Sequence, residues 1–300
     1  MEDLSMLVTL KEILENAKEG KYAVGAFNVP NLESIRAVIE SAEELNIPVI
    51  LQHAECHDNL ISLDEVGPIM VEWAKKATVP VCVHLDHGES FETCMKAIRL
   101  GFTSVMFDAS AKPFEENVAG TKEVVKAAHA VGVSVEAELG NMFTSSVGGG
   151  EGRGPVDASN FNSLDDCYTN PDLAKQFVEE TGVDALAIAF GTSHGVYLTE
   201  PQLDLNRITQ IKEKIDIPFV MHGGSGVSEE DFKQAIQNGI TKINYYTYSS
   251  MAGGKAVQEW IAKCEAENSP VFFHDVAMTA QKAIKEDVKA AMKVFASSIL

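Results

Sequence analysis

The apolar run Val79-Pro80-Val81-Cys82-Val83 leads directly into His84-Leu85-Asp86-His87-Gly88, and this junction is the most informative stretch of the chain. A short apolar run that ends in a loop is typical of a buried strand in a parallel sheet. A carboxylic acid beside an imidazole at such an end can place a proton carrier next to a metal ligand. The alternative is that these polar residues only face solvent, as many at strand ends do.

Two later stretches repeat the pattern of an apolar run followed by a polar end. Gly191-Thr192-Ser193-His194-Gly195 follows one such run, and Met221-His222-Gly223-Gly224-Ser225-Gly226 follows another. Three histidines that arrive in this way from distant parts of the sequence are hard to explain as coincidence. The repetition favours a shared site over solvated strand ends.

Apolar runs alternate with amphipathic segments along the whole chain, at the spacing of βα repeats. The strand candidates are Tyr22 to Val29, Pro48 to His53, Val79 to Leu85, Ser104 to Asp108, Ser134 to Leu139, Ala185 to Phe190, Pro218 to His222 and Lys242 to Tyr246. The helix candidates between them are Asn31 to Asn46, Leu63 to Ala77, Ser90 to Leu100, Phe114 to Val131, Pro171 to Thr181, Asp204 to Ile215 and Ser228 to Asn238.

Eight such repeats predict an α/β fold of the (β/α)8 TIM barrel type, with helices Gly254 to Asn268 and His274 to Phe295 packed outside it. The rival is an open doubly wound sheet, which would concentrate its site at one switch point. The barrel is favoured because polar residues follow strands from both halves of the chain. With 300 residues and 45% hydrophobic content, residues 1–300 are expected to form one domain.

The balance of charge excludes some classes of partner. The chain has 44 acidic and 24 basic residues, for a net charge of −20. Such a field repels nucleic acid and anionic membrane surfaces, so neither is expected as a partner. It also repels small anions, so a site for an anionic substrate must supply positive potential locally, from a metal ion, helix N-termini or backbone N–H groups.

The cysteines and the N-terminus indicate a cytoplasmic protein. Five cysteines are scattered without C-x-x-C spacing, which fits free thiols in a reducing compartment. Met1-Glu2-Asp3-Leu4 lacks the basic region and apolar core of a signal peptide. No uninterrupted apolar stretch approaches the roughly 18 residues of a membrane span.

On a barrel, the C-terminal ends of distant strands converge on one face. We therefore expect seven polar residues to share a cavity: Asn28, Asp86, His87, Glu138, His194, His222 and Asn244. Three neutral imidazoles suit Zn²⁺ and leave a position open for a substrate oxygen, although Co²⁺ or Fe²⁺ would accept the same ligands. Glu136 faces the same way as Glu138 on one strand, and one of the two can instead hold a ligand in place.

The glycines of Gly223-Gly224-Ser225-Gly226 let backbone N–H groups approach an anion closely. The stretch follows a strand and precedes a helix whose N-terminus adds positive potential. It therefore predicts a phosphate-type site, flanked by Asn244, Tyr246 and Thr247 at the end of the last strand. A simple tight turn is the alternative.

The other histidines divide into two groups. His129 and His274 fall in or beside helices and are expected to be surface or packing residues. His53 and His57 follow the second strand, where contact with a substrate and simple packing are both open. His84 shares a strand face with Asp86 and is expected to orient it.

Taken in order, these residues resemble the class II metal-dependent ketose-bisphosphate aldolases, the family of fructose-bisphosphate and tagatose-bisphosphate enzymes. The match runs from about Tyr22 to Thr247 through Ala26-Phe27-Asn28, His84-Leu85-Asp86-His87, Val135-Glu136-Ala137-Glu138-Leu139-Gly140, Gly191-Thr192-Ser193-His194-Gly195-Val196-Tyr197 and His222-Gly223-Gly224-Ser225-Gly226. Enzymes of this family are typically dimers or tetramers, so the resemblance implies a homodimer or homotetramer.

The resemblance also implies roles for individual residues. His87, His194 and His222 would be zinc ligands, and Glu138 a transient or second-site ligand. Asp86 would be the acid/base at the C4 hydroxyl of the ketose. The substrate and phosphate contacts, near a monovalent cation such as Na⁺ or K⁺, would be Asn28, Gly195, Gly223, Ser225, Asn244 and Thr247.

The reaction so implied is the reversible cleavage of a phosphorylated ketose, similar to fructose 1,6-bisphosphate or tagatose bisphosphate, into dihydroxyacetone phosphate and an aldehyde. A metal stabilises the negative charge that is left when C3–C4 breaks. A lysine Schiff base could do this without metal. We expect Lys242 to open its strand and Lys112 to lie in a loop, so no lysine is expected deep at a strand end.

Three departures from the family pattern leave the sugar open. The Gly149-Gly150-Glu151-Gly152-Arg153 run comes late and lacks the following Asp, although Glu151 is the candidate second acid. Tyr246 stands where the family has an acidic or small residue. The segment Ser269-Pro270-Val271-Phe272-Phe273-His274 lacks the arginine that commonly binds a distal phosphate. A metal-dependent barrel hydrolase and a non-catalytic sugar-phosphate-binding barrel remain the alternatives.

Overall fold

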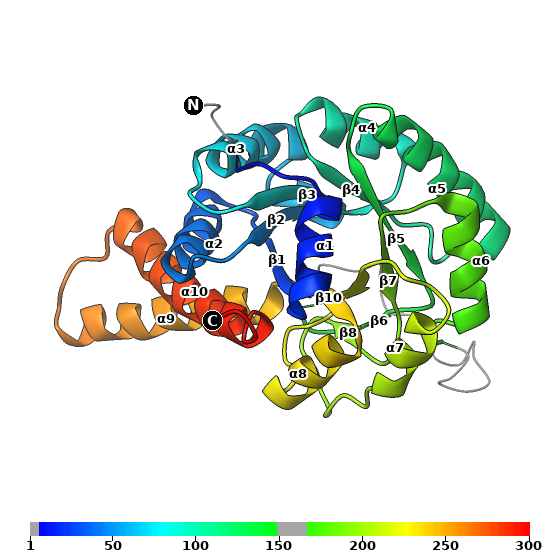
Figure 1. The fold of residues 1–300 in the computed structure, drawn as a ribbon. Helices are drawn as coiled ribbons and strands as arrows, with labels where there is room; N and C mark the ends of the chain where they lie inside the picture. The colour runs from blue at the N-terminus through cyan, green and yellow to red at the C-terminus, as the bar shows by residue number, and fades with distance from the viewer. Residues whose placement is uncertain (1–5, 149–166) are drawn as a thin grey trace.

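Eight parallel strands close into a barrel at the centre of the molecule (Figure 1). The structure is a computed structural model that describes residues 6–148 and 167–300. The strands follow the order β1-β10-β9-β7-β5-β4-β3-β2 around the barrel, so the predicted (β/α)8 fold is confirmed and an open sheet is excluded. They are β1 (Val24–Asn28), β2 (Val49–Ala54), β3 (Val81–Gly88), β4 (Ser104–Phe107), β5 (Ser134–Leu139), β7 (Ala185–Ile188), β9 (Phe219–Met221) and β10 (Ile240–Tyr245).

Helices surround this barrel on the outside (Figure 1). They are α2 (Leu32–Leu45), α3 (Leu63–Lys76), α4 (Phe91–Arg99), α5 (Phe114–His129), α6 (Pro171–Thr181), α7 (Leu205–Lys212), α8 (Glu229–Asn238), α9 (Thr247–Ala266) and α10 (Phe273–Phe295). Several begin at a capping side chain, as α2 does at Asn31 and α8 at Ser228. Across the described residues, none of the helices combines the length and the apolar character that a membrane span requires.

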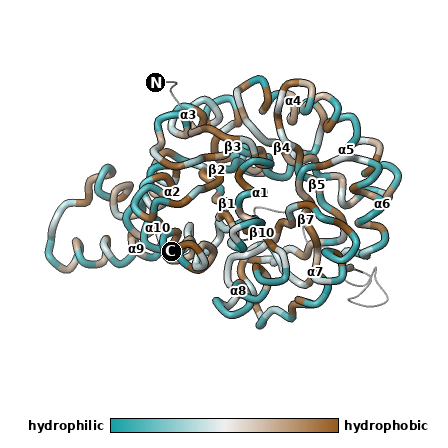
Figure 2. The backbone as a smooth tube through the Cα atoms, viewed as in Figure 1, coloured by the Kyte–Doolittle hydropathy of each residue, from teal (hydrophilic) through white to brown (hydrophobic). Residues whose placement is uncertain are grey.

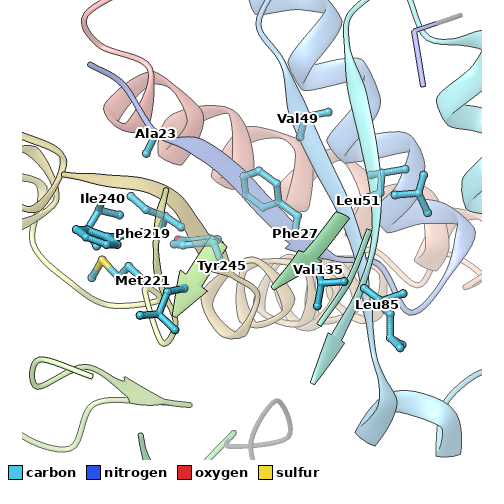
Figure 3. Packing of buried hydrophobic residues seen from close by; sticks show 14 of the residues in the cluster. Ala23, Phe27, Val49, Leu51, Leu85, Val135, Phe219, Met221, Ile240 and Tyr245 are labelled. Carbon is cyan, nitrogen blue, oxygen red and sulfur yellow. The ribbon is translucent and has the colours of Figure 1, made fainter. Parts of the chain in front are cut away.

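Alternate residues of each strand face opposite sides of the barrel wall. Val49 and Leu51 of β2 pack outward in the layer between barrel and helices, with Phe27, Leu85 and other strand residues (Figure 3). Hydrophobic residues accordingly concentrate along the strands, while the outer surfaces of the helices are hydrophilic (Figure 2). The inward positions are partly polar, which is where a site can form.

An N-terminal helix that the periodicity did not predict closes one end of the barrel. This helix, α1 (Leu10–Gly20), contacts strands β1, β3, β5 and β10, which lie on different sides of the barrel. Its buried residues Leu10, Ile13 and Leu14 join the inward-facing Ala26 and Ile50 in one apolar cluster. The opposite, C-terminal end of the barrel is therefore the end at which polar side chains can gather.

The helix predicted to start at Gly254 in fact starts at Thr247, immediately after β10. Gly253 and Gly254 both lie inside α9. A Cβ on Gly253 would stand 3.0 Å from Ile284 Cγ1 of α10, so glycine here allows the two helices to approach closely. The helices α9 and α10 pack on each other and project from the barrel as a hairpin (Figure 1).

Three short elements at the C-terminal end of the barrel were also not predicted. A 3₁₀ turn, η1 (Glu55–Asn59), follows β2 directly. The two-residue strands β6 (Phe143–Thr144) and β8 (Ser193–His194) pair in parallel outside the barrel sheet. Elements of two to five residues carry too little periodicity to be recognised in a sequence.

Candidate active site and metal centre

Three histidine side chains meet at the C-terminal end of the barrel. His87 lies at the end of β3, His194 in β8 and His222 directly after β9, and all three are buried. Each offers a ring nitrogen within 4.8 Å of the other two. The ring centroids are 4.6 Å apart for His87 and His222, 5.1 Å for His87 and His194, and 5.8 Å for His194 and His222. The structure thus brings together the three histidines that the strand-end pattern nominated.

A β-bulge at the end of β3 lets two consecutive residues face the same cavity. In a regular strand Asp86 and His87 would point to opposite faces. Between Leu85 and Gly88, however, β3 gains one residue relative to β4. His87 takes a left-handed backbone conformation there, with φ of 47°, which is uncommon for a residue with a side chain. The bulge turns the imidazole toward the cavity that Asp86 already faces.

Two carboxylates set the orientation of two of the histidines. His87 Nδ1 lies 2.7 Å from Asp108 Oδ2, and His222 Nε2 lies 2.9 Å from Glu136 Oε1. An ionised carboxylate only accepts hydrogen bonds, so each ring donates through that nitrogen and turns its other nitrogen to the centre. The two central nitrogens, His87 Nε2 and His222 Nδ1, are 3.0 Å apart. Carboxylates orient ligating histidines in this way in protein metal sites.

His194 supplies the observation that tests whether a metal fits. Both of its ring nitrogens are buried, and neither has a hydrogen-bond partner in residues 6–148 and 167–300. Burial, together with the charges of His87 and His222, holds the pKa of His194 well below its ordinary value. A neutral buried imidazole with an unused lone pair can serve as a metal ligand. The donor set fits Zn²⁺, which binds histidine nitrogens at about 2.0–2.1 Å in tetrahedral sites.

The loops that carry His194 and His222 are held against each other by Tyr197. The Tyr197 hydroxyl accepts a hydrogen bond from the Ser193 N–H at 2.8 Å and donates one to the Gly223 carbonyl at 2.9 Å. Gly223 has φ of +64°, and a Cβ there would stand 2.5 Å from the Ser193 carbonyl oxygen. Only glycine fits this approach, which brings the backbones beside the two ligands into contact.

Asp86 is held by side-chain amides from two other strands and from β10. Its Oδ2 accepts hydrogen bonds from Asn28 Nδ2 at 3.0 Å and Gln52 Nε2 at 3.1 Å, and its Oδ1 accepts one from Asn244 Nδ2 at 3.1 Å. Burial raises the pKa of Asp86, but the charge of His87 and nearby cationic groups outweighs this and holds it well below its ordinary value. The carboxylate is fixed, ionised and 3.9 Å from His87 Nε2. The sequence interpretation did not include Gln52.

An ion pair lies inside the barrel beneath the histidines. Lys242 Nζ and Glu136 Oε2 are 2.8 Å apart, and neither side chain is exposed. The expectation that Lys242 merely opens its strand was wrong: it is the third residue of β10 and faces inward. Burial raises the pKa of Glu136, but Lys242 and His222 lower it to about 2. His84 lies 3.5 Å from this carboxylate and 2.8 Å from Ser104 Oγ, so it supports Glu136 and has no direct hydrogen bond to Asp86.

A second group of potential ligands shares one histidine with the first. His87, Asp108 and Glu138 also place one ligand atom each within 4.8 Å of one another. Glu138 Oε2 lies 3.5 Å from His222 Nδ1 as well. Glu138 therefore stands beside both groups, in a place from which it can reach a metal ion held by either.

In the Gly223-Gly224-Ser225-Gly226 turn, which the sequence predicts as a phosphate site, some backbone N–H groups already have a partner within the protein. The Gly224 N–H donates to the Asn244 carbonyl at 3.1 Å and is not available to a ligand. No protein acceptor among the described residues lies opposite the N–H groups of Ser225 and Gly226. The Ser225 hydroxyl accepts from the Tyr246 N–H at 3.1 Å, which joins the turn to the end of β10.

The two histidines after β2 have different surroundings. His53 Nε2 lies 2.8 Å from Asp58 Oδ1, which also accepts from the Leu63 N–H at 3.0 Å, so His53 fixes the turn η1. His57 is buried with its ring against Tyr246, at 4.8 Å between centroids. Glu151, the expected second acid, lies outside the described residues.

The comparison with protein families gives one full-length match. The family described as fructose-bisphosphate aldolase class-II matches residues 8–299. A fructose-bisphosphate aldolase of Staphylococcus aureus is 43% identical over 295 residues, which cover 97% of this chain and 98% of that protein. A probable fructose-bisphosphate aldolase of Bacillus subtilis is 44% identical over 297 residues, with the same coverage.

Solved structures agree with the sequence relatives. The crystal structure of the YdjI aldolase from Escherichia coli K12 matches with a TM-score of 0.80 and 36% identity, over 96% of this chain and 97% of that one. A putative fructose-1,6-bisphosphate aldolase from Coccidioides immitis matches with a TM-score of 0.83 and 26% identity, over 97% and 96% of the two chains.

Proposed function

Because the chain belongs to the class II fructose-bisphosphate aldolase family, we propose that it catalyses reversible, metal-dependent aldol cleavage of a phosphorylated ketose to dihydroxyacetone phosphate and an aldehyde. The observation that carries the proposal is the meeting of three buried imidazole nitrogens beside the fixed carboxylate of Asp86. A fructose 1,6-bisphosphate-like or tagatose bisphosphate-like ketose is the substrate class that the family supports.

His87, His194 and His222 would hold the metal, and Zn²⁺ is the ion that three neutral imidazoles favour, with Co²⁺ or Fe²⁺ as substitutes. When bound, the ion would polarise the substrate oxygens and stabilise the negative charge that develops on the donor half. Glu138 is placed to act as a further ligand. Asp108 and Glu136 keep the histidine rings turned to the centre.

Asp86 is the group we propose for proton transfer at the ketose C4 hydroxyl. As an ionised carboxylate it accepts that proton at an Oδ atom, while the C4–O bond becomes the aldehyde carbonyl and the C3–C4 electron pair stays on C3. The amides of Asn28, Gln52 and Asn244 hold the carboxylate in place for this step. A second acid must then protonate C3, and Glu151 stays the prediction for it.

The phosphate end of the substrate is proposed to lie at the turn between β9 and α8. The N–H groups of Ser225 and Gly226 offer positive potential there. The helix α8 begins shortly after them, but its first turn carries Glu229, Glu230 and Asp231. Gly195, Gly223, Asn244 and Thr247 are proposed to contact the same end of the substrate, and Asn28 would contact the substrate beside Asp86. A monovalent cation, Na⁺ or K⁺, is proposed to share this end with the phosphate.

We further propose one catalytic domain over residues 1–300, which assembles as a homodimer or homotetramer in the cytoplasm. Support for assembly comes from the projecting hairpin of α9 and α10, whose tip exposes Phe272 by 52% and Phe273 by 85%. Support for a reducing compartment comes from five free cysteines, four of them buried.

The test is a cleavage assay with fructose and tagatose 1,6-bisphosphates and with ketose 1-phosphates, before and after removal of metal by a chelator. The proposal expects dihydroxyacetone phosphate from at least one substrate, loss of this activity on chelation, and recovery with Zn²⁺. Full activity in the stripped protein would exclude the metal mechanism. Ester or amide hydrolysis without ketose cleavage would instead favour a hydrolase.

A further inference from the structure

A cavity of about 540 Å³ opens beside the metal centre, on the side where the second strand ends. One wall is the turn η1 with Cys56 and His57, and the opposite wall is the start of α9 with Tyr246 and Thr247. Val196, close to the ligand His194 in sequence, closes a third side. Of the described residues given a role in the proposed function, only Thr247, at the phosphate end, lines this space.

His57 is a buried polar residue of this cavity that has no role in the proposed function. Its side chain is only 3% exposed, and its Nδ1 has no hydrogen-bond partner within the described part of the chain. It lies near enough to the reaction centre to interact electrostatically with Asp86 and His87. A buried polar atom with no partner costs stability unless a ligand completes it.

Tyr246 fixes the position of that imidazole. The two rings contact each other with centroids 4.8 Å apart and planes tilted by 53°. Tyr246 also lines a second cavity, together with Asn28, which donates to Asp86. Tyr246 thus lines both cavities, and its ring lies against His57 of the cavity that Thr247 also lines.

Burial also decides what kind of group His57 can recognise. It lowers the pKa of His57 to about 4, with the charge of His53 adding to the effect. The ring is therefore neutral at physiological pH and offers a hydrogen bond, not a positive charge. Such a group can donate a hydrogen bond to a sugar hydroxyl or accept one from it.

We infer that His57 is a specificity-determining residue, which hydrogen-bonds through Nδ1 to a hydroxyl group on the aldehyde half of the sugar. The inference rests on the proposed aldolase function, in which Asp86 faces the C4 oxygen. His57 lies close enough to Asp86 to interact with it electrostatically, so it can meet a hydroxyl group beside C4. The Tyr246 ring holds His57 in place for this contact.

Condensation of dihydroxyacetone phosphate with matched aldehydes tests this contact. Glycolaldehyde and glyceraldehyde carry a hydroxyl next to the carbonyl carbon, whereas acetaldehyde has none. For His57→Phe, which keeps a ring and removes the nitrogens, we expect kcat/KM to fall about tenfold or more for the hydroxylated aldehydes. The kcat/KM of His57→Phe for acetaldehyde should stay within about twofold of the wild-type value, and its zinc content should not change.

His57→Asn provides the rescue, because its amide stands about where Nδ1 stands and can still pair with a hydroxyl. It should retain most of the preference for hydroxylated aldehydes. An equal loss for all three aldehydes, or no loss for any, would overturn the inference. If the unaltered protein condenses none of them, the proposed function itself fails, which is a distinct result.

Discussion

At the scale of single residues, Asp86 and Asp108 are two buried carboxylates near His87 that have different work. Asp86 is held by three amide donors and faces the cavity, whereas Asp108 accepts from His87 Nδ1. We predict that Asp86→Asn lowers kcat by about 10²–10⁴-fold and keeps its zinc, because the amide cannot accept the C4 proton and Asp86 is not among the proposed zinc ligands.

Asp108→Asn is the matched variant and should behave in the opposite way. Its zinc affinity should fall about 10–100-fold, with activity largely restored at saturating zinc. Zinc titration against a chelator and steady-state kinetics measure both effects. Unchanged kcat in Asp86→Asn would remove that residue from the proton-transfer role.

The buried His57 also predicts a pH dependence of stability. Its pKa lies at about 4 in the folded protein against 6.5 for an ordinary histidine, because of burial and the charges of His53 and His87, with Asp86 opposing. Below pH 6.5 the imidazole of His57 is protonated in the unfolded chain, whereas in the folded chain it stays neutral until the pH approaches 4. The stabilisation is thus complete above pH 6.5 and is lost as the pH falls toward 4, by up to about 1.4 kcal/mol per unit.

Urea unfolding at pH 7, 6 and 5 measures this effect. Wild type should lose stability over this range more steeply than His57→Asn, which has no titrating group at that position. If the unfolding free energies of the two proteins change with pH in parallel, His57 has the same pKa in the folded and unfolded states.

The histidines and Asp86 could be nominated from the sequence because each follows a recognisable apolar run. The side chains that hold these residues in place could not be predicted from the sequence. Gln52 sits within an apolar strand, and Lys242 is an inward residue of β10, where the sequence alone does not reveal which opposite strand supplies its carboxylate. Such pairs depend on the closed geometry of the barrel and not on periodicity.

At the scale of elements, β5 and β10 are joined across the barrel interior by the ion pair of Glu136 and Lys242. We predict that Lys242→Met lowers the free energy of unfolding by about 3–5 kcal/mol, because it leaves a buried carboxylate without its cation. The double variant Lys242→Met with Glu136→Gln should recover part of this loss, since no unpaired charge remains.

Denaturant unfolding of the metal-free proteins measures these differences. If the double variant were as unstable as the sum of the two single variants, the two side chains would not be energetically coupled, and the ion pair would not be the cause.

The barrel strands were predictable as elements because each is an apolar run between polar loops. The errors have physical causes. The helix α9 starts at Thr247 and not at Gly254, and Gly253 inside it allows the close approach of Ile284, a contact between two helices that the sequence does not reveal. The bulge that turns His87 depends on the register against β4, which the sequence of β3 alone does not contain.

At the scale of the whole molecule, the hairpin of α9 and α10 projects from the barrel with an apolar tip. We predict that Phe273→Asp shifts the protein toward monomers in light scattering after size-exclusion chromatography, because a charge would be buried in the contact between copies. Val131→Asp is the control, since Val131 is also exposed, by 62%, but at the other end of the fold beside α5. If both variants have the same oligomeric state as wild type, the interface lies elsewhere.

The central claim is that His87, His194 and His222 hold one catalytic metal ion. Anomalous diffraction at the zinc edge, from crystals of protein that is active as purified, tests it most directly. The predicted result is a single strong peak about 2.0–2.1 Å from His87 Nε2, His222 Nδ1 and one ring nitrogen of His194. An active protein without a peak between these three rings would contradict the claim.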